Sequence, residues 1–399
     1  MTPYLIADDL SGALEAGAAF NARGWRVTLP LTKHAIVPDA GGLTVISTET
    51  RNASPADAGA TVRQVLAEQR AADARLLYKK IDSTLRGPLG AELTAITEEL
   101  RPPLIVVCPA NPRAGRIVRN GVLYVEGVSL EKSEFRNDPH WPAKTGDICA
   151  LLASQGIAGA RRVSLEALHV DSVAPFEPVR SRKDSEVTIL VPDAETTSDV
   201  EAVVSAVRLM EPASVFVGSG AVGTALAQQM PPTTSHSGTW PIVTGFVVLC
   251  GSRHPVSDRQ LEFLQHAGAA VVMTAALEES LDKQMDHIGE ALTKSSVVAL
   301  RFFAAPDAED ASVSLLKRIS EVAVRLPQSH ALYLTGGETA WAACRALQGE
   351  SLEILRELQP GVVAARLSRK NGPAIVVVTK PGGFGDAESI STPIRMLMK

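Results

Sequence analysis

Residues 4–13 read Tyr4-Leu5-Ile6-Ala7-Asp8-Asp9-Leu10-Ser11-Gly12-Ala13, an apolar run that ends in two acids and continues into a helical pattern. Short β-branched runs of this kind recur along most of the chain, and amphipathic stretches lie between them. Strands that are apolar throughout and alternate with helices are typical of parallel sheets covered on both faces. The sequence therefore predicts the α/β class, with mainly parallel sheets flanked by helices.

The same pattern predicts where the individual elements lie. The predicted strands are Tyr4–Ala7, Leu43–Ser47, Leu76–Lys80, Leu104–Cys108, Val187–Val191, Ser214–Val217, Phe246–Cys250, Val297–Leu300, Ala331–Leu334 and Ala374–Val378. The predicted helices include Asp8–Arg23, Ala56–Arg70, Leu89–Leu100, Val200–Met210, Ser257–His266 and Ser312–Val324.

The chain has 399 residues, which exceeds the length of about 150 residues that is usual for one domain. Residues 230–241 read Met-Pro-Pro-Thr-Thr-Ser-His-Ser-Gly-Thr-Trp-Pro, and this Pro, Ser and Thr content is typical of a linker. We therefore expect two domains, one over residues 1–230 and one over residues 240–399. The segment Gly121–Leu130 predicts an inserted β-ribbon rather than another βα unit.

Composition and charge exclude several classes of protein. With 45% hydrophobic and 21% charged residues, the bulk of the chain is not disordered, and a net charge of −5 argues against a nucleic-acid partner. No run of 18 apolar residues occurs, so we expect no membrane span. The first residues lack the basic segment of a secretory signal, and the four cysteines show no metal-binding spacing. These features predict a cytoplasmic protein without zinc.

Asp8 and Asp9 follow the first predicted strand directly. In open α/β sheets, ligands bind beyond the carboxyl ends of the strands. Two adjacent carboxylates at such a place could hold Mg²⁺, bind substrate hydroxyls or supply a general base. Alternatively, Asp9 or Ser11 could do no more than cap the following helix.

A second polar cluster follows the predicted strand Leu76–Lys80. The segment reads Lys80-Ile81-Asp82-Ser83-Thr84-Leu85-Arg86-Gly87, and Arg51 follows another strand at the expected same edge of the sheet. Cations suit the carboxylate of a ligand, and an acid with hydroxyls suits its alcohol groups. The cluster therefore predicts a site for an anionic, polyhydroxylated ligand, with a solvated turn as the alternative.

Three glycine-bearing turns end strands in the C-terminal part. They are Gly251-Ser252, Gly336-Gly337-Glu338-Thr339 and Gly382-Gly383-Phe384-Gly385. Glycines let backbone N–H groups approach phosphate oxygens, and helix N-termini favour anions. Three such turns in one domain predict a phosphate site, although ordinary turns that need a positive φ would show the same residues.

Gly218-Ser219-Gly220-Ala221-Val222-Gly223 fits the dinucleotide pattern G-x-G-x-x-G after a strand. That pattern also requires an acid about 20 residues later for the ribose hydroxyls. No Asp or Glu lies between Glu211 and Asp258. An NAD-dependent oxidoreductase is therefore kept only as an alternative.

Taken together, the strings Ala7–Ala13, Lys80–Gly87, Gly251-Ser252, Gly336–Thr339 and Lys380–Gly385 resemble the four-carbon acid sugar kinases. The resemblance spans almost the whole chain in the same order. It implies an N-terminal acid-sugar domain, a C-terminal nucleotide domain and an active site in the cleft between them. It further implies phosphorylation of the terminal 4-hydroxyl of threonate, erythronate or 3-oxo-tetronate by ATP with Mg²⁺.

The resemblance and the polar clusters together assign the candidate residues. The substrate would contact Asp8, Asp9, Arg51, Lys80, Ile81, Asp82, Ser83 and Arg86. ATP would contact Ser252, Gly336, Gly337, Glu338, Thr339, Gly382, Gly383 and Gly385. Asp9 is the favoured general base, with Asp82 as the alternative, and no metal ligand is assigned.

The sequence departs from the family pattern in two places. Leu10 and Ser11 replace the usual aromatic residue and threonine, and Arg253-His254 stands where the family carries a second hydroxyl for the nucleotide. The second departure leaves open a sensor that binds both ligands without turnover. The sequence does not decide which stereoisomer is used or whether the chain forms a homo-oligomer.

Overall fold

The computed structural model describes residues 2–32, 42–170, 187–233, 243–303 and 311–398. The chain forms two compact units. Unit 1 comprises residues 1–25 and 35–233, and unit 2 comprises residues 26–34 and 234–399. Most of the predicted linker, residues 234–241, lies outside the described residues.

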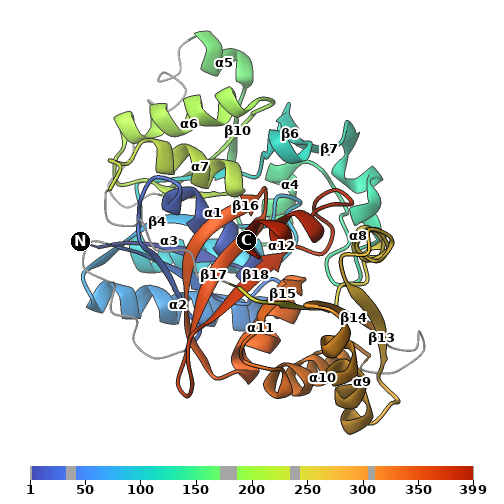
Figure 1. Cartoon of the computed structure of the whole chain (residues 1–399). Coiled ribbons are helices and arrows are strands. Elements are labelled where there is room, and N and C mark those ends of the chain that lie inside the picture. Colours follow the sequence, from blue (N-terminus) through green and yellow to red (C-terminus); the bar gives the residue numbers. More distant parts are fainter. Residues whose placement is uncertain (1, 33–41, 171–186, 234–242, 304–310, 399) are drawn as a thin grey trace. The chain divides into compact units, whose positions relative to one another are not determined.

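Unit 1 is built around a seven-stranded parallel sheet in the order β3-β1-β4-β11-β5-β10-β9. Figure 1 labels β4 and β10 of this sheet. Its strands are β1 (Thr2–Ala7), β3 (Leu43–Ser47), β4 (Ala74–Lys80), β5 (Leu104–Cys108), β9 (Arg161–Val163), β10 (Thr188–Pro192) and β11 (Val215–Gly218). Its α-helices are α1 (Leu10–Asn21), α2 (Pro55–Ala71), α3 (Leu89–Leu100), α4 (Ile148–Ser154), α5 (Leu165–Val170), α6 (Thr197–Met210) and α7 (Gly220–Gln228). Because α1 packs on α7 and α2 packs on α3, these helices cover the strands in two layers.

A separate antiparallel sheet carries the inserted ribbon of unit 1. It consists of β6 (Arg116–Arg119), β7 (Val122–Val125) and β8 (Val128–Ser129). Three short 3₁₀ turns flank it, namely η1 (Pro112–Ala114), η2 (Leu130–Lys132) and η3 (Glu134–Asn137). The predicted β-ribbon is therefore confirmed, and it begins a few residues earlier than expected.

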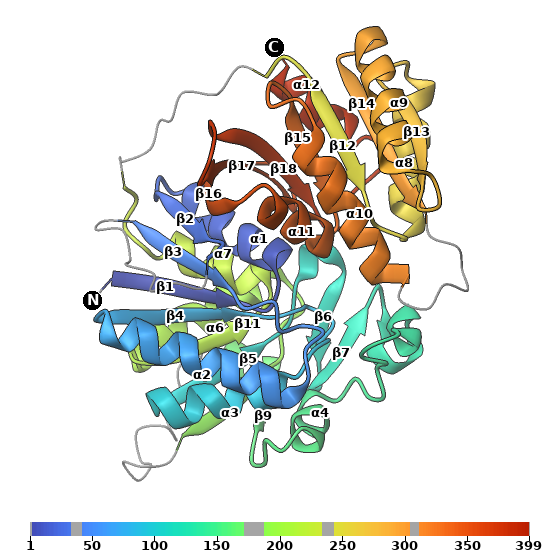
Figure 2. The same ribbon diagram turned by 90° about the horizontal axis from the view of Figure 1, so that it is seen from below.

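Unit 2 has a mixed sheet in the order β13-β14-β12-β15-β18-β17-β16-β2 (Figure 2). The strands are β2 (Val27–Pro30), β12 (Phe246–Cys250), β13 (Val271–Ala276), β14 (Val297–Phe303), β15 (Ala331–Thr335), β16 (Gly349–Gln359), β17 (Val362–Arg369) and β18 (Ile375–Lys380). The helices are α8 (Pro255–His266), α9 (Leu281–Lys294), α10 (Ala311–Arg325), α11 (Gly337–Ala346) and α12 (Ser391–Leu397). Strands β13, β14, β12, β15 and β18 are parallel, whereas β17, β16 and β2 pair antiparallel. The predicted α/β class is confirmed.

Strand register places the ends of parallel strands level with one another. In unit 1, Ala7 pairs with Ser47 and with Lys80, and Lys80 pairs in turn with Gly218. In unit 2, Cys250 pairs with Thr335, which pairs with Lys380 on its other side. The turns that follow these residues therefore lie at one edge of each sheet, where open α/β sheets bind ligands.

Residues Arg26–His34 belong to unit 2 although the chain before and after them belongs to unit 1. Strand β2 pairs with β16 through Leu29 and Leu352, and Arg345 Nη1 donates to the carbonyl of Leu31 at 2.7 Å. A single boundary at residue 230, as expected from the sequence, leaves this segment in the first domain. Leu29, Leu31 and Leu352 are all buried, so this segment contributes apolar side chains to the core of unit 2.

A substitution at Gly349 tests how tightly the segment around Leu31 is packed in unit 2. A Cβ at Gly349 would lie 2.7 Å from Leu367 Cδ1, 2.8 Å from the Cys344 carbonyl and 2.9 Å from Leu31 Cδ1. We expect Gly349→Ala to destabilise unit 2 by about 1–3 kcal/mol because of overpacking. Gly289→Ala is the matched control, because its Cβ meets nothing within 4 Å and helix α9 gains propensity. Calorimetric melting of both variants measures the difference, and equal melting temperatures would contradict the close packing.

Candidate functional site

The first polar cluster of unit 1 is an ion network centred on Arg51. Its Nε and Nη2 donate to the two Asp8 oxygens at 2.8 and 2.9 Å, and its Nη1 and Nη2 donate to the two Asp9 oxygens at 2.6 and 2.8 Å. Four of its five N–H donors are thus directed at carboxylates. Arg51 therefore orients the two acids, and its contact with a ligand carboxylate stays a prediction.

Asp9 has a structural partner besides Arg51. Its Oδ1 accepts from the N–H of Gly12 at 2.8 Å and caps helix α1, so the capping role holds alongside the ion pair. A Cβ at Gly12 would lie 2.7 Å from Asp9 Oδ1 and 3.2 Å from Lys80 Nζ. The glycine therefore lets the acid and the lysine approach each other.

The two adjacent acids differ in basicity. Burial alone would raise the pKa of Asp8, but Arg51 and Lys79 outweigh it and hold that pKa below its ordinary value. Burial raises the pKa of Asp9, and the neighbouring Asp8 charge adds to the rise that Arg51 opposes. Asp9 is therefore the member of the pair that takes up a proton more readily.

Lys79 and Lys80 point to opposite faces of β4, as successive residues of a strand must. Lys79 Nζ lies 3.1 Å from Glu92 Oε2 of α3, and Lys80 Nζ lies 3.2 Å from Glu15 Oε2 of α1. Burial alone would lower the pKa of Lys80, but the charges of Glu15 and Asp8 outweigh it and raise that pKa above its ordinary value. The ammonium group therefore stays charged. Each helix layer thus supplies a counter-charge to the buried strand.

Asp82 and Arg86 form a second ion network in the loop after β4. Arg86 Nε and Nη2 donate to the Asp82 oxygens at 2.8 and 3.1 Å, and Arg86 Nη1 lies 3.4 Å from Asp138 Oδ2. Burial would raise the pKa of Asp82, but Arg86 and Arg51 bring it well below the ordinary value. Asp82 is accordingly a weak proton acceptor.

Gly87 brings this loop to the backbone of Arg51. It has a φ of +107°, and its Cβ position would lie 3.4 Å from the Arg51 carbonyl oxygen. The loop after β4 and the residue after β3 are therefore neighbours. The remaining predicted residues are Ile81, whose N–H donates to the Gly218 carbonyl at 2.9 Å, and Ser83, which is half-buried in the same loop.

Sequence inspection missed several groups that surround these acids. Glu15 pairs with Lys80, and Lys79 lowers the pKa of Asp8. The Asp8 charge contributes to the raised pKa values of the buried Glu49 and Glu92 carboxyls, and Thr50 Oγ1 donates to Glu92 Oε1 at 2.5 Å. Glu49 has a left-handed φ of +52° and contacts Ser47 Oγ. The sequence signal that could have identified Glu49 is its position just after β3, at the same edge of the sheet as Arg51.

The glycine turn Gly218–Gly223 is packed for structural reasons. A Cβ at Gly218 would clash with the Cys108 carbonyl, and a Cβ at Gly223 would lie 3.1 Å from Tyr78 Cε1. A Cβ at Gly220, the first residue of α7, would clash with the Glu15 carboxylate. Because this helix N-terminus already faces a negative charge, it is unsuited to a dinucleotide pyrophosphate.

In unit 2 the three predicted glycine turns converge. A Cβ at Gly382 would clash with Ser252 Oγ, and a Cβ at Gly251 would clash with Thr339 Oγ1. Gly336 has a φ of +99°, and its N–H donates to the Lys380 carbonyl at 2.8 Å. The ends of β12, β15 and β18 thus form one cluster of glycines and hydroxyls next to the N-terminus of α11, which has no side-chain cap. Gly337 and Glu338 begin that helix, and Gly383 and Gly385 are exposed in the third turn.

His254 caps a helix in this cluster. Its Nδ1 accepts from the N–H of Val256 at 3.2 Å, at the start of α8. A Cβ at Gly383 would lie 3.2 Å from His254 Nε2, so the imidazole lies beside that glycine. Arg253 Nη2 lies 3.3 Å from Ser312 Oγ. The residue that replaces the family's second hydroxyl therefore keeps a structural role at the same turn.

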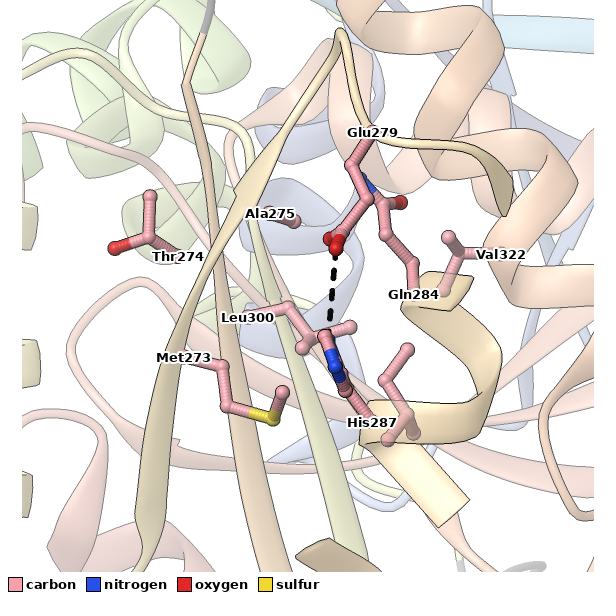
Figure 3. A pocket seen from close by; sticks show the side chains of 9 residues that line it. Met273, Thr274, Ala275, Glu279, Gln284, His287, Leu300 and Val322 are labelled. Carbon is pink, nitrogen blue, oxygen red and sulfur yellow. Dashed lines mark ion pairs between the residues drawn. The ribbon is translucent and has the colours of Figure 1, made fainter. Parts of the chain in front are cut away.

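A small pocket lies apart from these clusters, against the edge strand β13 (Figure 3). Met273, Gln284 and Leu300 line it, and His287 Nδ1 lies 3.6 Å from Glu279 Oε1 beside it. Its volume of ≈ 20 Å³ is enough for about one water molecule. It is too small for either predicted ligand.

Both parts of the chain are similar to known proteins. Residues 4–226 match the family described as a sugar-binding N-terminal domain, and residues 247–390 match a nucleotide-binding C-terminal domain. A D-threonate kinase of Bordetella bronchiseptica is 30% identical over 97% of this chain and 95% of its own length. A D-erythronate kinase of Heliobacterium modesticaldum is 26% identical over 99% of this chain and 96% of its own length.

A solved structure shares the fold. The protein described as a putative tRNA synthase from Salmonella typhimurium superposes with a TM-score of 0.81 and 22% identity, covering 99% of both chains. Among the described residues, no helix is long and apolar enough to cross a membrane.

The buried carboxyl group of Glu49 makes the stability of the fold depend on pH. Burial raises the pKa of its carboxyl to about 8, and the Asp9 charge adds to this rise, which Ser47 partly opposes. Because the folded-state pKa exceeds the ordinary value of 4.5, the protonated form stabilises the fold fully below pH 4.5. That contribution is lost progressively as the pH rises through about 8.

Glu49→Gln removes this dependence. We expect the variant to gain about 1–2 kcal/mol relative to the natural chain between pH 6 and 9, after allowance for solvent screening. Denaturant unfolding at both pH values measures the gain, and Glu98→Gln on the exposed surface is the control. A stability difference that does not change with pH would contradict the assignment.

Proposed function

Because the chain belongs to the family of four-carbon acid sugar kinases, we propose that it transfers the γ-phosphoryl group of ATP to the 4-hydroxyl of a four-carbon sugar acid such as threonate, erythronate or 3-oxo-tetronate. One observation carries the proposal. In each unit, the residues predicted for one ligand gather at the carboxyl ends of parallel strands, around Arg51 in unit 1 and around Gly382 in unit 2.

The cations of unit 1 would hold the carboxylate of the sugar acid. Arg86 is the most accessible of them, with a side chain 31% exposed against 17% for Arg51 and 5% for Lys80. It also retains N–H donors beyond those bound to Asp82 and Asp138. Arg86 is therefore the proposed carboxylate contact, and Lys80 and Arg51 supply positive charge behind it.

Asp9 is the proposed proton acceptor. The substrate hydroxyl oxygen bonds to the γ-phosphorus, the bond to the β–γ bridging oxygen breaks, and ADP leaves with that electron pair. The hydroxyl proton passes to Asp9, the more basic of the two acids bound to Arg51. Phosphoryl transfer depends mainly on positioning and charge stabilisation, which a fixed carboxylate serves.

The protein's own residues do not fit a resident Mg²⁺. Among the described residues, no group of three metal-binding side chains occurs. Arg51 already donates to all four carboxylate oxygens of Asp8 and Asp9, so neither acid presents an oxygen without a donor to a metal ion. Mg²⁺ is expected to arrive on the phosphate oxygens of ATP, to which it binds readily, and the roles proposed above need no protein-held metal.

The function is tested by ADP formation with Mg-ATP and a panel of sugar acids. The panel holds the D and L forms of threonate and erythronate, their 3-oxo derivatives and, as a three-carbon control, glycerate. We expect turnover with at least one four-carbon acid. Saturable binding of a sugar acid and of ATP without ADP formation would instead support a sensor, and a change in nicotinamide absorbance would support an oxidoreductase.

The role of Asp9 is tested by Asp9→Asn. We expect kcat to fall by about 10²–10⁴, the usual contribution of general base catalysis, with the KM for ATP little changed. Asp147→Asn is the matched control, because Asp147 caps α4 through the Ala150 N–H at the same 2.8 Å but touches no cation network. An unchanged kcat in Asp9→Asn would remove Asp9 as the base.

A further inference from the structure

Lys380, the last residue of β18, holds a buried ammonium group surrounded by backbone carbonyls. Its side chain is fully buried, and Nζ donates to the carbonyls of Pro381 at 2.8 Å, Gly382 at 3.1 Å and Phe384 at 3.0 Å. Among the described residues, no carboxylate forms an ion pair with it. All three ammonium hydrogens are therefore committed to one turn of backbone.

Two side chains of α8 hold the same turn from the other side. Ser257 Oγ donates to the Gly382 carbonyl at 2.8 Å, and Gln260 Nε2 donates to the Phe384 carbonyl at 3.0 Å. In contrast, the N–H groups of Gly382 and Gly383 find no acceptor within the described part of the chain. The carbonyls of the turn are thus directed inward, and these two N–H groups remain available for an anion.

The N–H groups of Gly382 and Gly383 lie beside the other two glycine turns that are predicted to bind phosphate. Gly382 packs so closely against Ser252 that a Cβ would clash with its hydroxyl oxygen. Gly336, which precedes the uncapped helix α11, donates to the carbonyl of Lys380 itself. Because the ammonium has no carboxylate partner, its charge adds to the positive potential of the helix N-terminus.

We propose that Lys380 is a positioning residue for the nucleotide phosphates: its ammonium group turns the carbonyls of Pro381, Gly382 and Phe384 inward, so that the N–H groups of Gly382 and Gly383 face the phosphate oxygens. This inference rests on the proposed function, since it requires a nucleotide at the glycine turns. It assigns a role to a residue that touches no ligand directly.

The surroundings of Lys380 give its role a dependence on pH. Burial lowers the pKa of Lys380 to about 8, and Cys250 opposes the shift slightly. Burial raises the pKa of the Cys250 thiol and of the Tyr333 phenol, so neither titrates near pH 8. The titratable His254 lies against Gly383 of the same turn. Charged groups on the adjacent elements include Asp258 on α8, Glu338 on α11, Arg366 on β17, Arg395 on α12 and Asp386 in the following loop. A neutral amine has two N–H donors for three carbonyls, so deprotonation loosens the turn and removes its charge.

The first test measures ADP binding by calorimetry in Lys380→Met and Lys380→Gln. We expect the dissociation constant for ADP to rise about tenfold or more in both, since a charge-assisted anchor is lost. The KM for ATP should rise with it while the KM for the sugar acid stays unchanged. Lys294→Met removes an exposed lysine of the same unit and is the control for net charge. Binding within twofold of the natural chain in folded Lys380→Met would overturn the proposal.

A second test can be decided with the natural chain alone. In the natural chain, ADP affinity is measured from pH 7.5 to 9.5, where ADP itself stays fully ionised. We expect affinity to fall several-fold across this range, about the size of one lost charge-assisted hydrogen bond, and Lys380→Gln to show no such fall. A flat profile in the natural chain would overturn the role of Lys380.

The outcomes separate this inference from the proposed function. If the natural chain binds ADP with the expected pH profile but phosphorylates no sugar acid, the role of Lys380 stands and the proposed substrate class fails. If sugar acids are phosphorylated and Lys380→Met binds ADP normally, the inference alone fails. Absence of ADP binding in the natural chain would refute both.

Discussion

The requirement that a buried cation meet its counter-charge organises unit 1. Arg51 is held by both oxygens of Asp8 and of Asp9, which ties the loop after β3 to the end of β1. Lys79 and Lys80 face opposite sides of β4 and take Glu92 and Glu15 from the two helix layers. Removing one member of such a buried pair costs about 3–5 kcal/mol, because it strands the other charge. The same pairs that align the sheet edge therefore fix the geometry of the site.

Unit 2 compensates its buried cation in a different way. Lys380 is surrounded by backbone carbonyls rather than by carboxylates, so its charge is solvated but not neutralised. Unit 1 has a carboxylate for each buried cation, which suits a ligand that carries hydroxyls as well as one carboxylate. In unit 2 the Lys380 ammonium, which has no carboxylate partner among the described residues, lies in a turn with glycine N–H groups, and this arrangement suits the negative charges of a nucleotide. The two arrangements match the two ligands of a sugar acid kinase.

Most regular elements were predictable from local pattern. Buried parallel strands such as Leu43–Ser47, Leu104–Cys108 and Phe246–Cys250 were predicted with their observed bounds, because both faces of such strands are apolar. The antiparallel strands β16 and β17 were missed. The segment Gly349–Gln359 reads Gly-Glu-Ser-Leu-Glu-Ile-Leu-Arg-Glu-Leu-Gln, whose Leu and Glu content favours a helix, yet pairing with β17 and β2 makes it a strand. Strand β2 was also missed, since β16, with which it pairs, lies more than 300 residues away in sequence.

The sequence by itself determined which polar residues follow strand ends, because strand ends in an open α/β sheet can be located from apolar runs and ligands bind beyond them. Asp8, Asp9, Arg51, Lys80 and Asp82 were assigned to the candidate site in this way. Only the tertiary structure decided how their charges are shared. That Arg51 is committed to two acids, that Asp82 is neutralised by Arg86, and that Lys380 supports a backbone turn depend on distances of about 3 Å between segments distant in the chain. Spacing along the sequence cannot encode those distances, since side-chain pairing is set by strand order and helix packing.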